Sequence, residues 1–245
     1  MQDRPRYPSR IPQSEIRRRA SPDSALTVAD MKEYLFFDLD GTLTDSAPGI
    51  IRSAKYAMSH FGITLDDRTM HRFIGPPLAE SFRNLCGLSE RDSLEAIRLY
   101  REYFAAKGMF ENSVYEGVAE MLRHLKESGK ILAVATSKPE VYAKQITDHF
   151  GLTPYFDVIA GAALDHVHMT KSDVLQNAVC GVGLRDLSLG LMIGDREHDV
   201  LGAKALGMET LGVLYGYGSE EELLRAGAAA LAQTPKDVTA YVLCE

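Results

Sequence analysis

The sequence contains no tryptophan, few cysteines and no long apolar run. Its three cysteines, Cys86, Cys180 and Cys244, are far apart and form no Cys-x-x-Cys pair. This pattern argues against a disulfide framework and favours a reduced, cytoplasmic protein. No apolar stretch approaches the roughly 20 residues that cross a membrane, and no signal peptide is recognisable. We therefore expect no association with a membrane.

Basic side chains are in the minority. The chain has 27 Lys and Arg residues against 34 Asp and Glu residues, which gives a net charge of −7. Proteins bind nucleic-acid backbones through basic surfaces, so nucleic-acid binding is not expected. A small anionic substrate remains compatible with this charge, because one lysine or metal ion can hold a phosphate. The sequence also has no GxxxxGK[ST] loop, which argues against a P-loop kinase.

The N-terminal segment differs from the rest of the chain. Residues 1–31 are rich in arginine and proline, with few apolar residues and no hydrophobic period. We predict a disordered or loosely attached tail. Met31 stands just before the first predicted strand, and a natural start there is the alternative interpretation of this segment.

After this tail, apolar runs alternate with amphipathic stretches. Continuous apolar runs are typical of strands that are buried on both faces, as in a parallel sheet. We expect strands at 34–38, 131–135, 156–160, 187–193 and 210–214. We expect helices at about 117–128, 139–150, 171–180, 198–206 and 219–226. Strands that alternate with helices predict an α/β fold with a doubly wound parallel sheet.

One long segment interrupts this alternation. Residues 48–113 contain no strand-like run but have helical periods at 48–61, 66–73, 77–86 and 89–107. We predict a smaller all-helical domain, inserted after the first strand into a core formed by residues 32–47 and 114–245. The glycine and two prolines at 75–77 predict a sharp turn inside the insertion.

An acidic pair follows the first predicted strand. In open α/β sheets the working residues gather beyond the carboxyl ends of the strands. Asp38 and Asp40 are two residues apart, so they face the same side of an extended chain. Carboxylates this close repel each other unless a cation or a proton intervenes. A cation would keep Asp38 ionised and able to attack, whereas a shared proton would let Asp40 act as an acid.

Two further segments carry groups suited to phosphate. Thr136 and Ser137 stand at a strand end before a helix, where hydroxyl and backbone N–H groups can bind a phosphate. Lys171 precedes another helix and is placed to neutralise charge on a phosphoryl group. Each signal is weak alone, because Ser and Thr are also common N-caps and a lysine at a helix start is usually solvated.

A second acidic pair follows a later strand. Asp195 comes directly after the run 187–193 and Gly194, and Asp199 follows four residues later. Beside Asp38, these oxygens would form the hard, oxygen-rich site that Mg²⁺ prefers. Capping of a helix by acidic residues in its first turn is the alternative.

The order and spacing of these four segments resemble the haloacid dehalogenase-like superfamily of hydrolases. The resemblance covers about residues 34–214, and the helical segment 48–113 is similar to the small cap of the phosphoglycolate-phosphatase-like branch, some of whose members are nucleotidases. The residues that match the four family motifs are DLDGT at 38–42, Thr136, Lys171, and GDREHD at 194–199. The third motif departs from the Gly-Lys-Pro of many relatives, because Thr170 and Ser172 flank the lysine.

The resemblance implies a Mg²⁺-dependent phosphatase acting on a small phosphomonoester such as phosphoglycolate, a nucleoside monophosphate or a sugar phosphate. It implies that Asp38 is the nucleophile, that Asp40 is the general acid and base, and that Asp199 supports the metal site from behind the ligands. It further assigns the metal ligands, which are Asp38, the backbone carbonyl of Asp40, and Asp195, and the phosphoryl-binding groups, which are Thr136, Ser137 and Lys171.

Two other functions use similar residues. A sugar-phosphate mutase of the same superfamily would share all of them and differ in the access of water. A phospho-accepting receiver domain, which is a signalling module, also combines Asp, Thr or Ser, Lys and Mg²⁺ on an α/β sheet. Receiver domains are about half this length and have no helical insertion. Asp40 favours phosphate esters, because relatives that cleave carbon–halogen or carbon–phosphorus bonds lack this acid.

Overall fold

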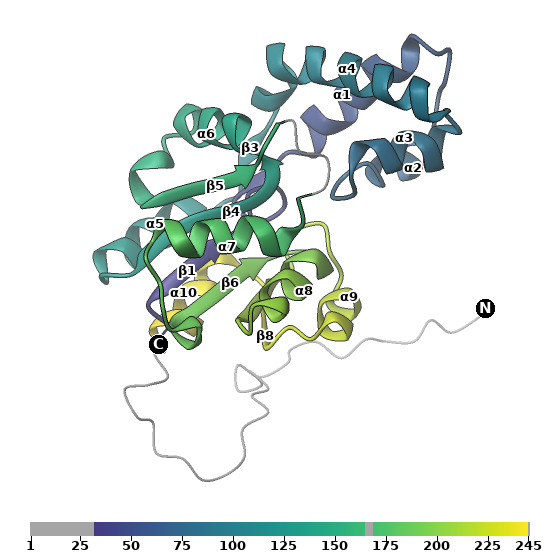
Figure 1. Ribbon diagram of the computed structural model, residues 1–245. Coiled ribbons are helices and arrows are strands. Elements are labelled where there is room, and N and C mark those ends of the chain that lie inside the picture. Colours follow the sequence, from purple (N-terminus) through teal and green to yellow (C-terminus); the bar gives the residue numbers. More distant parts are fainter. Residues whose placement is uncertain (1–31, 165–168, 245) are drawn as a thin grey trace, which may run out of the picture.

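A computed structural model describes residues 32–164 and 169–244, and the predicted N-terminal tail lies outside these ranges (Figure 1). Its main sheet has six parallel strands in the order β5-β4-β1-β6-β7-β8. These strands are β1 (Tyr34–Phe37), β4 (Ile131–Pro139), β5 (Val158–Ala162), β6 (Gly190–Gly194), β7 (Glu209–Val213) and β8 (Ala230–Ala232). The chain runs outward from β1 on both sides, so the order reverses at β1, where open α/β sheets bind their ligands.

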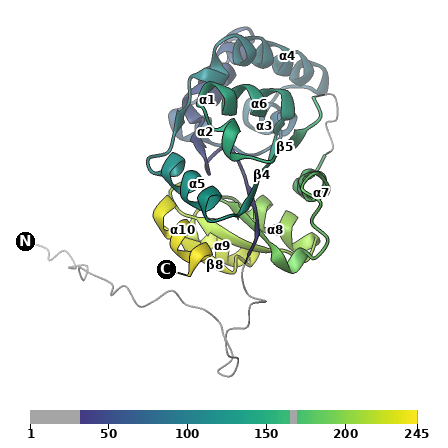
Figure 2. The same ribbon diagram turned by 90° about the vertical axis from the view of Figure 1, so that its left-hand side faces the viewer.

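Helices cover both faces of this sheet (Figures 1 and 2). Residues of α5, α6 and α10 pack in one hydrophobic cluster, and residues of α7 and α8 pack in a second. The helices of this part are α5 (Val118–Glu127), α6 (Glu140–His149), α7 (Lys171–Gly181), α8 (Glu197–Ala205), α9 (Glu220–Ala226) and α10 (Pro235–Leu243), with 3₁₀ turns η3 (Thr153–Tyr155) and η4 (Leu187–Leu189). This arrangement confirms the predicted doubly wound parallel sheet.

The central strand shows why a continuous apolar run was required. Leu35 and Phe37 face the cluster that contains α5 and α10, whereas Phe36 faces the cluster that contains α7. All three side chains are buried. Because successive side chains of a strand point to opposite faces, a polar residue in β1 would enter one core or the other. From Tyr34 onward, the first charged side chain therefore comes directly after β1, at Asp38.

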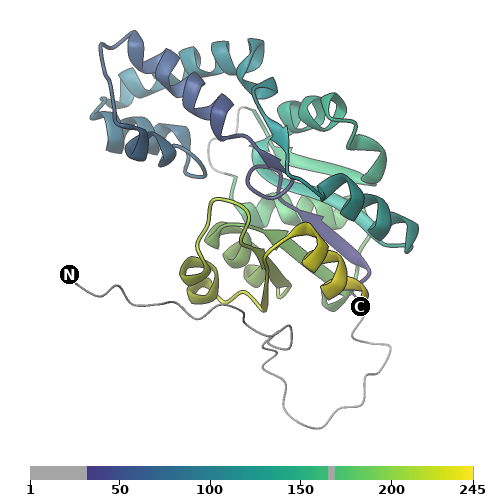
Figure 3. The same cartoon turned by 180° about the vertical axis from the view of Figure 1, so that it is seen from behind.

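Four helices interrupt the sheet between its first two strands. They group beyond the carboxyl ends of the strands, as Figures 1 and 3 show. They are α1 (Ala47–Ser59), α2 (Asp67–His71), α3 (Leu78–Cys86) and α4 (Glu90–Ala106), followed by the 3₁₀ turn η2 (Gly108–Phe110). A short antiparallel pair, β2 (Thr44–Asp45) and β3 (Ser113–Val114), joins the two ends of the segment. Each of the four predicted helical periods thus corresponds to one helix.

Some local predictions were wrong. Pro139 does not begin a helix, because β4 extends through it and it serves as the N-cap of α6. The helix predicted at about 171–180 ends one residue later, at Gly181. The predicted strand at 187–193 begins only at Gly190, because η4 occupies its first residues.

Candidate active site

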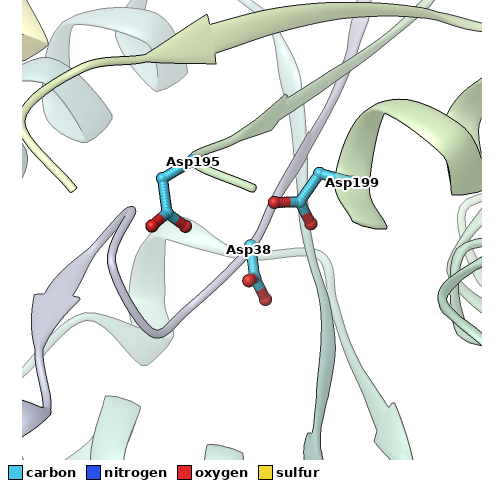
Figure 4. Close-up of side chains that lie close together, drawn as sticks. All are labelled: Asp38, Asp195 and Asp199. Atoms are coloured by element: carbon cyan, nitrogen blue, oxygen red, sulfur yellow. The ribbon is translucent and has the colours of Figure 1, made fainter. Parts of the chain in front are cut away.

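Two neighbouring strands end in carboxylates that lie side by side. β1 and β6 are parallel, and Phe37 is in register with Ile193. Asp38 and Asp195 therefore leave the sheet at the same edge. Asp199, in the first turn of α8, completes a group in which one carboxylate oxygen from each residue lies within 4.8 Å of the others (Figure 4). Three of the predicted site residues are thus brought together from segments more than 150 residues apart.

Lys171 connects two of these carboxylates. It is the first residue of α7, after the Thr170 cap, and its side chain is only 5% exposed. Its Nζ lies 2.9 Å from Asp38 Oδ1 and 2.6 Å from Asp199 Oδ1. Burial alone would lower the pKa of this ammonium, but the Asp199 and Asp38 carboxylates raise it above its ordinary value. Lys171 therefore carries a fixed positive charge beside the predicted nucleophile.

Asp195 is held from two sides. The Thr42 hydroxyl donates to its Oδ1 at 3.3 Å, and the backbone N–H of Tyr217 donates to its Oδ2 at 2.8 Å. Burial, followed by the charges of Asp199 and Asp38, raises the pKa of Asp195 to about 8. The site thus concentrates more negative charge than Lys171 offsets.

Glycines make room for these carboxylates. Gly41 has a φ of +83°, and a Cβ at this position would lie 2.6 Å from Asp195 Cγ. A Cβ on Gly194 would collide with the Asp199 carboxylate, and one on Gly216 would lie 2.5 Å from Asp195 Cβ. Larger residues would separate the acidic side chains, so these positions require glycine for close approach.

Three clustered carboxylates fit a divalent cation. Hard oxygen donors with excess negative charge are the ligands that Mg²⁺ prefers, and Asp38 and Asp195 supply them here. Both oxygens of Asp199 are already engaged, one by Lys171 and the other by the backbone N–H of Arg196 at 3.0 Å. This engagement suits Asp199 to a supporting role.

Asp40 points toward a different partner. Its Oδ2 lies 2.9 Å from Lys138 Nζ, whereas its Oδ1 is buried without a hydrogen-bond partner among the described residues. The Lys138 side chain is 6% exposed and the Asp40 side chain 21%. The two acids of the first segment are therefore paired with two different lysines, Asp38 with Lys171 and Asp40 with Lys138.

The predicted phosphate-binding hydroxyls stand at the end of the neighbouring strand. β4 pairs with β1 in parallel, with Val134 opposite Phe37, so Thr136 lies at the same sheet edge as Asp38. Thr136 is buried, and its hydroxyl accepts from the backbone N–H of Lys138 at 3.3 Å. Ser137 is exposed at the point where β4 and β5 lose their regular register. Phosphate binding by this segment stays a prediction.

The helical segment contacts this site through Arg196. The Arg196 guanidinium donates through Nη1 to the backbone carbonyl of Ile74 at 3.1 Å. It donates through Nε to the Glu222 carboxylate at 2.7 Å. Gly75 has a φ of +102°, and a Cβ there would lie 2.6 Å from Arg196 Nη1. Beside this contact is a pocket of about 500 Å³, lined by residues of the segment 71–85 together with Arg196 and Tyr217.

Sequence reasoning did not assign Thr42, Lys138, Arg196 or Tyr217 to the site. Thr42 and Arg196 lie inside motifs that were recognised, so their position next to the acidic residues was the available signal. Lys138 follows the predicted phosphate-binding pair directly. Tyr217 lies in a glycine-rich loop after β7, and its hydroxyl bonds with Asp45 Oδ1 and the backbone N–H of Ala47, both at 2.9 Å. A pattern of sequence letters does not reveal such long-range partners.

No helix among residues 32–164 and 169–244 combines the length and apolarity needed to cross a membrane.

Comparison with known proteins gives a consistent result. The family model described as haloacid dehalogenase-like hydrolase matches residues 35–213. A 5'-nucleotidase of Pseudomonas aeruginosa is 43% identical over 190 residues, which cover 77% of this chain and 86% of that protein. The tyrosine-protein kinase PtkA of Mycobacterium tuberculosis is 43% identical over 204 residues, which cover 82% of this chain and 67% of the relative.

A solved structure agrees with this assignment. The crystal structure of a predicted phosphatase from Clostridium acetobutylicum superposes with a TM-score of 0.82 at 45% identity, covering 88% of this chain and 100% of the other. The family match spans most of the chain, and the acidic residues of the matched segments meet at one edge of the sheet. The chain therefore belongs to the haloacid dehalogenase-like hydrolase family and is a phosphatase of that family.

Proposed function

We propose that the chain hydrolyses a small phosphomonoester in a Mg²⁺-dependent reaction, through a phosphoaspartate formed on Asp38. The observation that carries this proposal is the group of Asp38, Asp195 and Asp199 around the buried Lys171 ammonium. Phosphoryl transfer depends mainly on placement and on charge balance. Without Lys171 and a cation, the Asp38 carboxylate and the substrate phosphate would repel each other.

The first half of the reaction breaks the ester. A carboxylate oxygen of Asp38 forms a bond to phosphorus while the bond between phosphorus and the leaving oxygen breaks. Asp40, as the carboxylic acid, gives its proton to that leaving oxygen. Lys171 contacts Asp38 Oδ1, so its charge is available to the phosphoryl oxygens as they approach. Thr136 and Ser137 would donate hydrogen bonds to the same oxygens.

The second half releases phosphate. Asp40, now ionised, takes a proton from a water molecule, and the water oxygen attacks phosphorus. The bond between phosphorus and Asp38 breaks, which yields inorganic phosphate and restores both carboxyl groups. Mg²⁺, held by Asp38, the backbone carbonyl of Asp40 and Asp195, with Asp199 in support, would stabilise charge on the phosphoryl group.

The helices α1–α4 would serve as a cap over this chemistry. We propose that residues 48–113 form a separate small domain that selects the leaving group. The pocket between residues 71–85 and the Arg196–Tyr217 side supports this assignment, because it opens beside the loop that bonds to Asp195. A nucleoside monophosphate is the first substrate to test, since one relative is named a 5'-nucleotidase. Phosphoglycolate and sugar phosphates complete the class.

A second candidate function is transfer of the phosphoryl group to the hydroxyl of an acceptor molecule in place of water. A relative with 43% identity is named a tyrosine-protein kinase. The same Asp38 chemistry would serve such a transfer, or the intramolecular transfer of a mutase, if the cap excluded water.

A release assay separates these functions. The full-length chain is mixed with nucleoside monophosphates, phosphoglycolate and sugar phosphates, with Mg²⁺ or with EDTA, and free phosphate is measured. We expect release from at least one ester with Mg²⁺ and its loss with EDTA. Phosphate that moves to another hydroxyl without being released would favour the second candidate. Turnover that is unchanged by EDTA would contradict the metal dependence.

A further inference from the structure

Lys138 has a buried side chain that plays no role in the reaction described above. Its side chain is 6% exposed, and its Nζ contacts Asp40 Oδ2 at 2.9 Å. The backbone around it is tightly packed, because a Cβ on Gly161 of β5 would lie 2.6 Å from the Lys138 carbonyl oxygen. A long, flexible side chain is thus anchored at both ends, by its own backbone and by the predicted acid.

The contact with Lys138 gives the two carboxylate oxygens of Asp40 different surroundings. Oδ2 is occupied by the ammonium, and Oδ1 is buried with no hydrogen-bond partner among the described residues. A buried carboxylate oxygen without a partner is costly unless something else occupies the space next to it. Oδ1 is therefore the atom of Asp40 that is free to meet a substrate oxygen or a water molecule.

The other neighbour of Lys138 belongs to the cap. Its Nζ lies 4.5 Å from the ring centroid of Phe104, on α4, which places the ammonium where the face of an aromatic ring attracts a cation. Phe104 is itself fixed by Tyr100, stacked at a centroid distance of 5.6 Å, and by Tyr142 of α6, edge-on at 5.3 Å. Burial, and then the nearby Asp40 charge, raise the pKa of the Tyr100 hydroxyl.

We propose that Lys138 is a positioning residue that holds Asp40 by Oδ2 and presents Oδ1 to the leaving oxygen, and that Phe104 of the cap keeps the ammonium in place. The Asp40 carboxyl group is then aligned for proton transfer only while α4 lies over it. This inference rests on the proposed function, because it assigns to Lys138 an effect on the proton donated by Asp40.

The test compares two aryl esters that differ in how much they need an acid. Phenyl phosphate has a poor leaving group, whereas 4-nitrophenyl phosphate releases a stabilised anion that needs little protonation. The measured quantity is kcat/KM with Mg²⁺, since it reports the steps up to the first irreversible one and not the later hydrolysis of the phosphoaspartate. The variant is Lys138→Met, which keeps an unbranched side chain, one atom shorter, and removes its charge.

We expect Lys138→Met to lower kcat/KM for phenyl phosphate by about tenfold or more and for 4-nitrophenyl phosphate by less than about threefold, because a placed general acid contributes about 10²- to 10⁴-fold. In an Asp40→Asn background the same substitution should change neither value further, since its effect passes through Asp40. Lys126→Met is the matched control. It removes a lysine that pairs with Asp157 at 2.6 Å on a more exposed surface, and it should leave the ratio of the two substrates unchanged.

A second variant leaves Lys138 intact. Phe104→Leu removes the ring but keeps an apolar side chain, and it should change the ratio of the two substrates in the same direction by a smaller factor. Equal losses on both esters, or a raised KM with unchanged kcat, would show that Lys138 binds substrate and would overturn the inference. A wild-type chain that releases phosphate from neither these esters nor any other phosphomonoester would instead refute the proposed function.

Discussion

The sheet and the four helices α1–α4 contribute to the site in different ways. The sheet supplies side chains directly, because β1 and β6 end next to each other and are followed by Asp38 and Asp195. The helices contact the site through residues of the core. Phe104 meets Lys138, and the carbonyl of Ile74 accepts from Arg196.

This difference separates two tasks. Groups at strand ends are held by the ladder of the sheet and can keep a fixed geometry for bond making and breaking. The Phe104 and Ile74 contacts from the helical segment are made to residues next to the acids, so they can change without removing any carboxylate. We therefore expect substitutions in the core cluster to lower kcat. Substitution at the Arg196–Ile74 contact should raise KM, and substitution at the Lys138–Phe104 contact should change the dependence on the leaving group.

The largest effect is expected for Asp38→Asn. The amide cannot attack phosphorus as a carboxylate does, so phosphate release should fall on the order of 10³-fold or more. Release is measured at saturating substrate with Mg²⁺, and circular dichroism checks that the fold is retained. Asp186→Asn, at an exposed turn where Asp186 accepts from the Ser188 backbone N–H, is the control. Near-normal turnover by Asp38→Asn would refute the mechanism.

Lys171→Met should lower both activity and stability. It leaves Asp38 and Asp199 without their ammonium, and removing one partner of a buried ion pair costs about 3 kcal/mol or more. We expect kcat to fall about 10²-fold, as when one charge-stabilising group is removed. Chemical unfolding measures the stability. Lys144→Met, which removes the partner of Glu140 in an exposed pair, should cost at most about 0.5 kcal/mol.

Arg196→Ala tests the contribution of the helical segment, which Arg196 contacts at Ile74. It removes the hydrogen bond to the Ile74 carbonyl and the ion pair with Glu222 but no carboxylate of the cluster. We expect KM to rise about tenfold, with kcat changed by less than about threefold, because a hydrogen bond from a charged group is worth about 1.5–3 kcal/mol. Arg225→Ala, which removes an exposed arginine 3.8 Å from Glu197, should leave both constants unchanged. A fall in kcat alone would contradict the separation of tasks.

A smaller effect is expected for the pH dependence of stability without metal. Burial and two neighbouring carboxylates raise the pKa of Asp195 from 3.8 to about 8. Between these values the folded protein holds a proton that the unfolded chain has lost, so stability should fall as the pH rises through this window.

Mg²⁺ binds ionised carboxylates, so at low pH its binding must displace the proton on Asp195. At high pH that proton is already lost. The rise in melting temperature on adding Mg²⁺ should therefore be larger at pH 8 than at pH 5.5, as thermal unfolding can measure. Asp195→Asn should remove most of this difference. An equal rise at both pH values in the unmodified chain would show that Asp195 is ionised without the metal.

The fold was predictable where burial leaves a clear pattern. The runs that became β1, β4, β6 and β7 were recognised because a central parallel strand must be apolar on both faces. β8 was not predicted, because three residues beginning at Ala230 carry too little pattern to distinguish a strand from a loop. α10 was also not predicted, although Thr234 and Asp237 form a capping box at its start that the sequence displays.

The candidate site divides in the same way. Asp38, Asp195 and Asp199 could be proposed as a group, because Asp38 and Asp195 each follow a recognisable strand, Asp199 comes four residues later, and parallel strands end at one edge. The partners of Lys138 and Arg196 could not be proposed, because the contacts with Phe104 and Ile74 depend on how the helices α1–α4 are placed over the sheet. Nothing in the local sequence around either basic residue encodes that placement.

Tyr217 bears on how such a protein could be re-engineered. Its backbone N–H holds Asp195, while its hydroxyl bonds with Asp45 and with the first residue of α1. One residue thus joins an acid of the core, through its backbone, to the point where the inserted helices begin, through its side chain. A chimaera that exchanges residues 48–113 for those of another family member leaves Tyr217, Asp45 and Ala47 in place, so the graft would begin at a point still tied to Asp195.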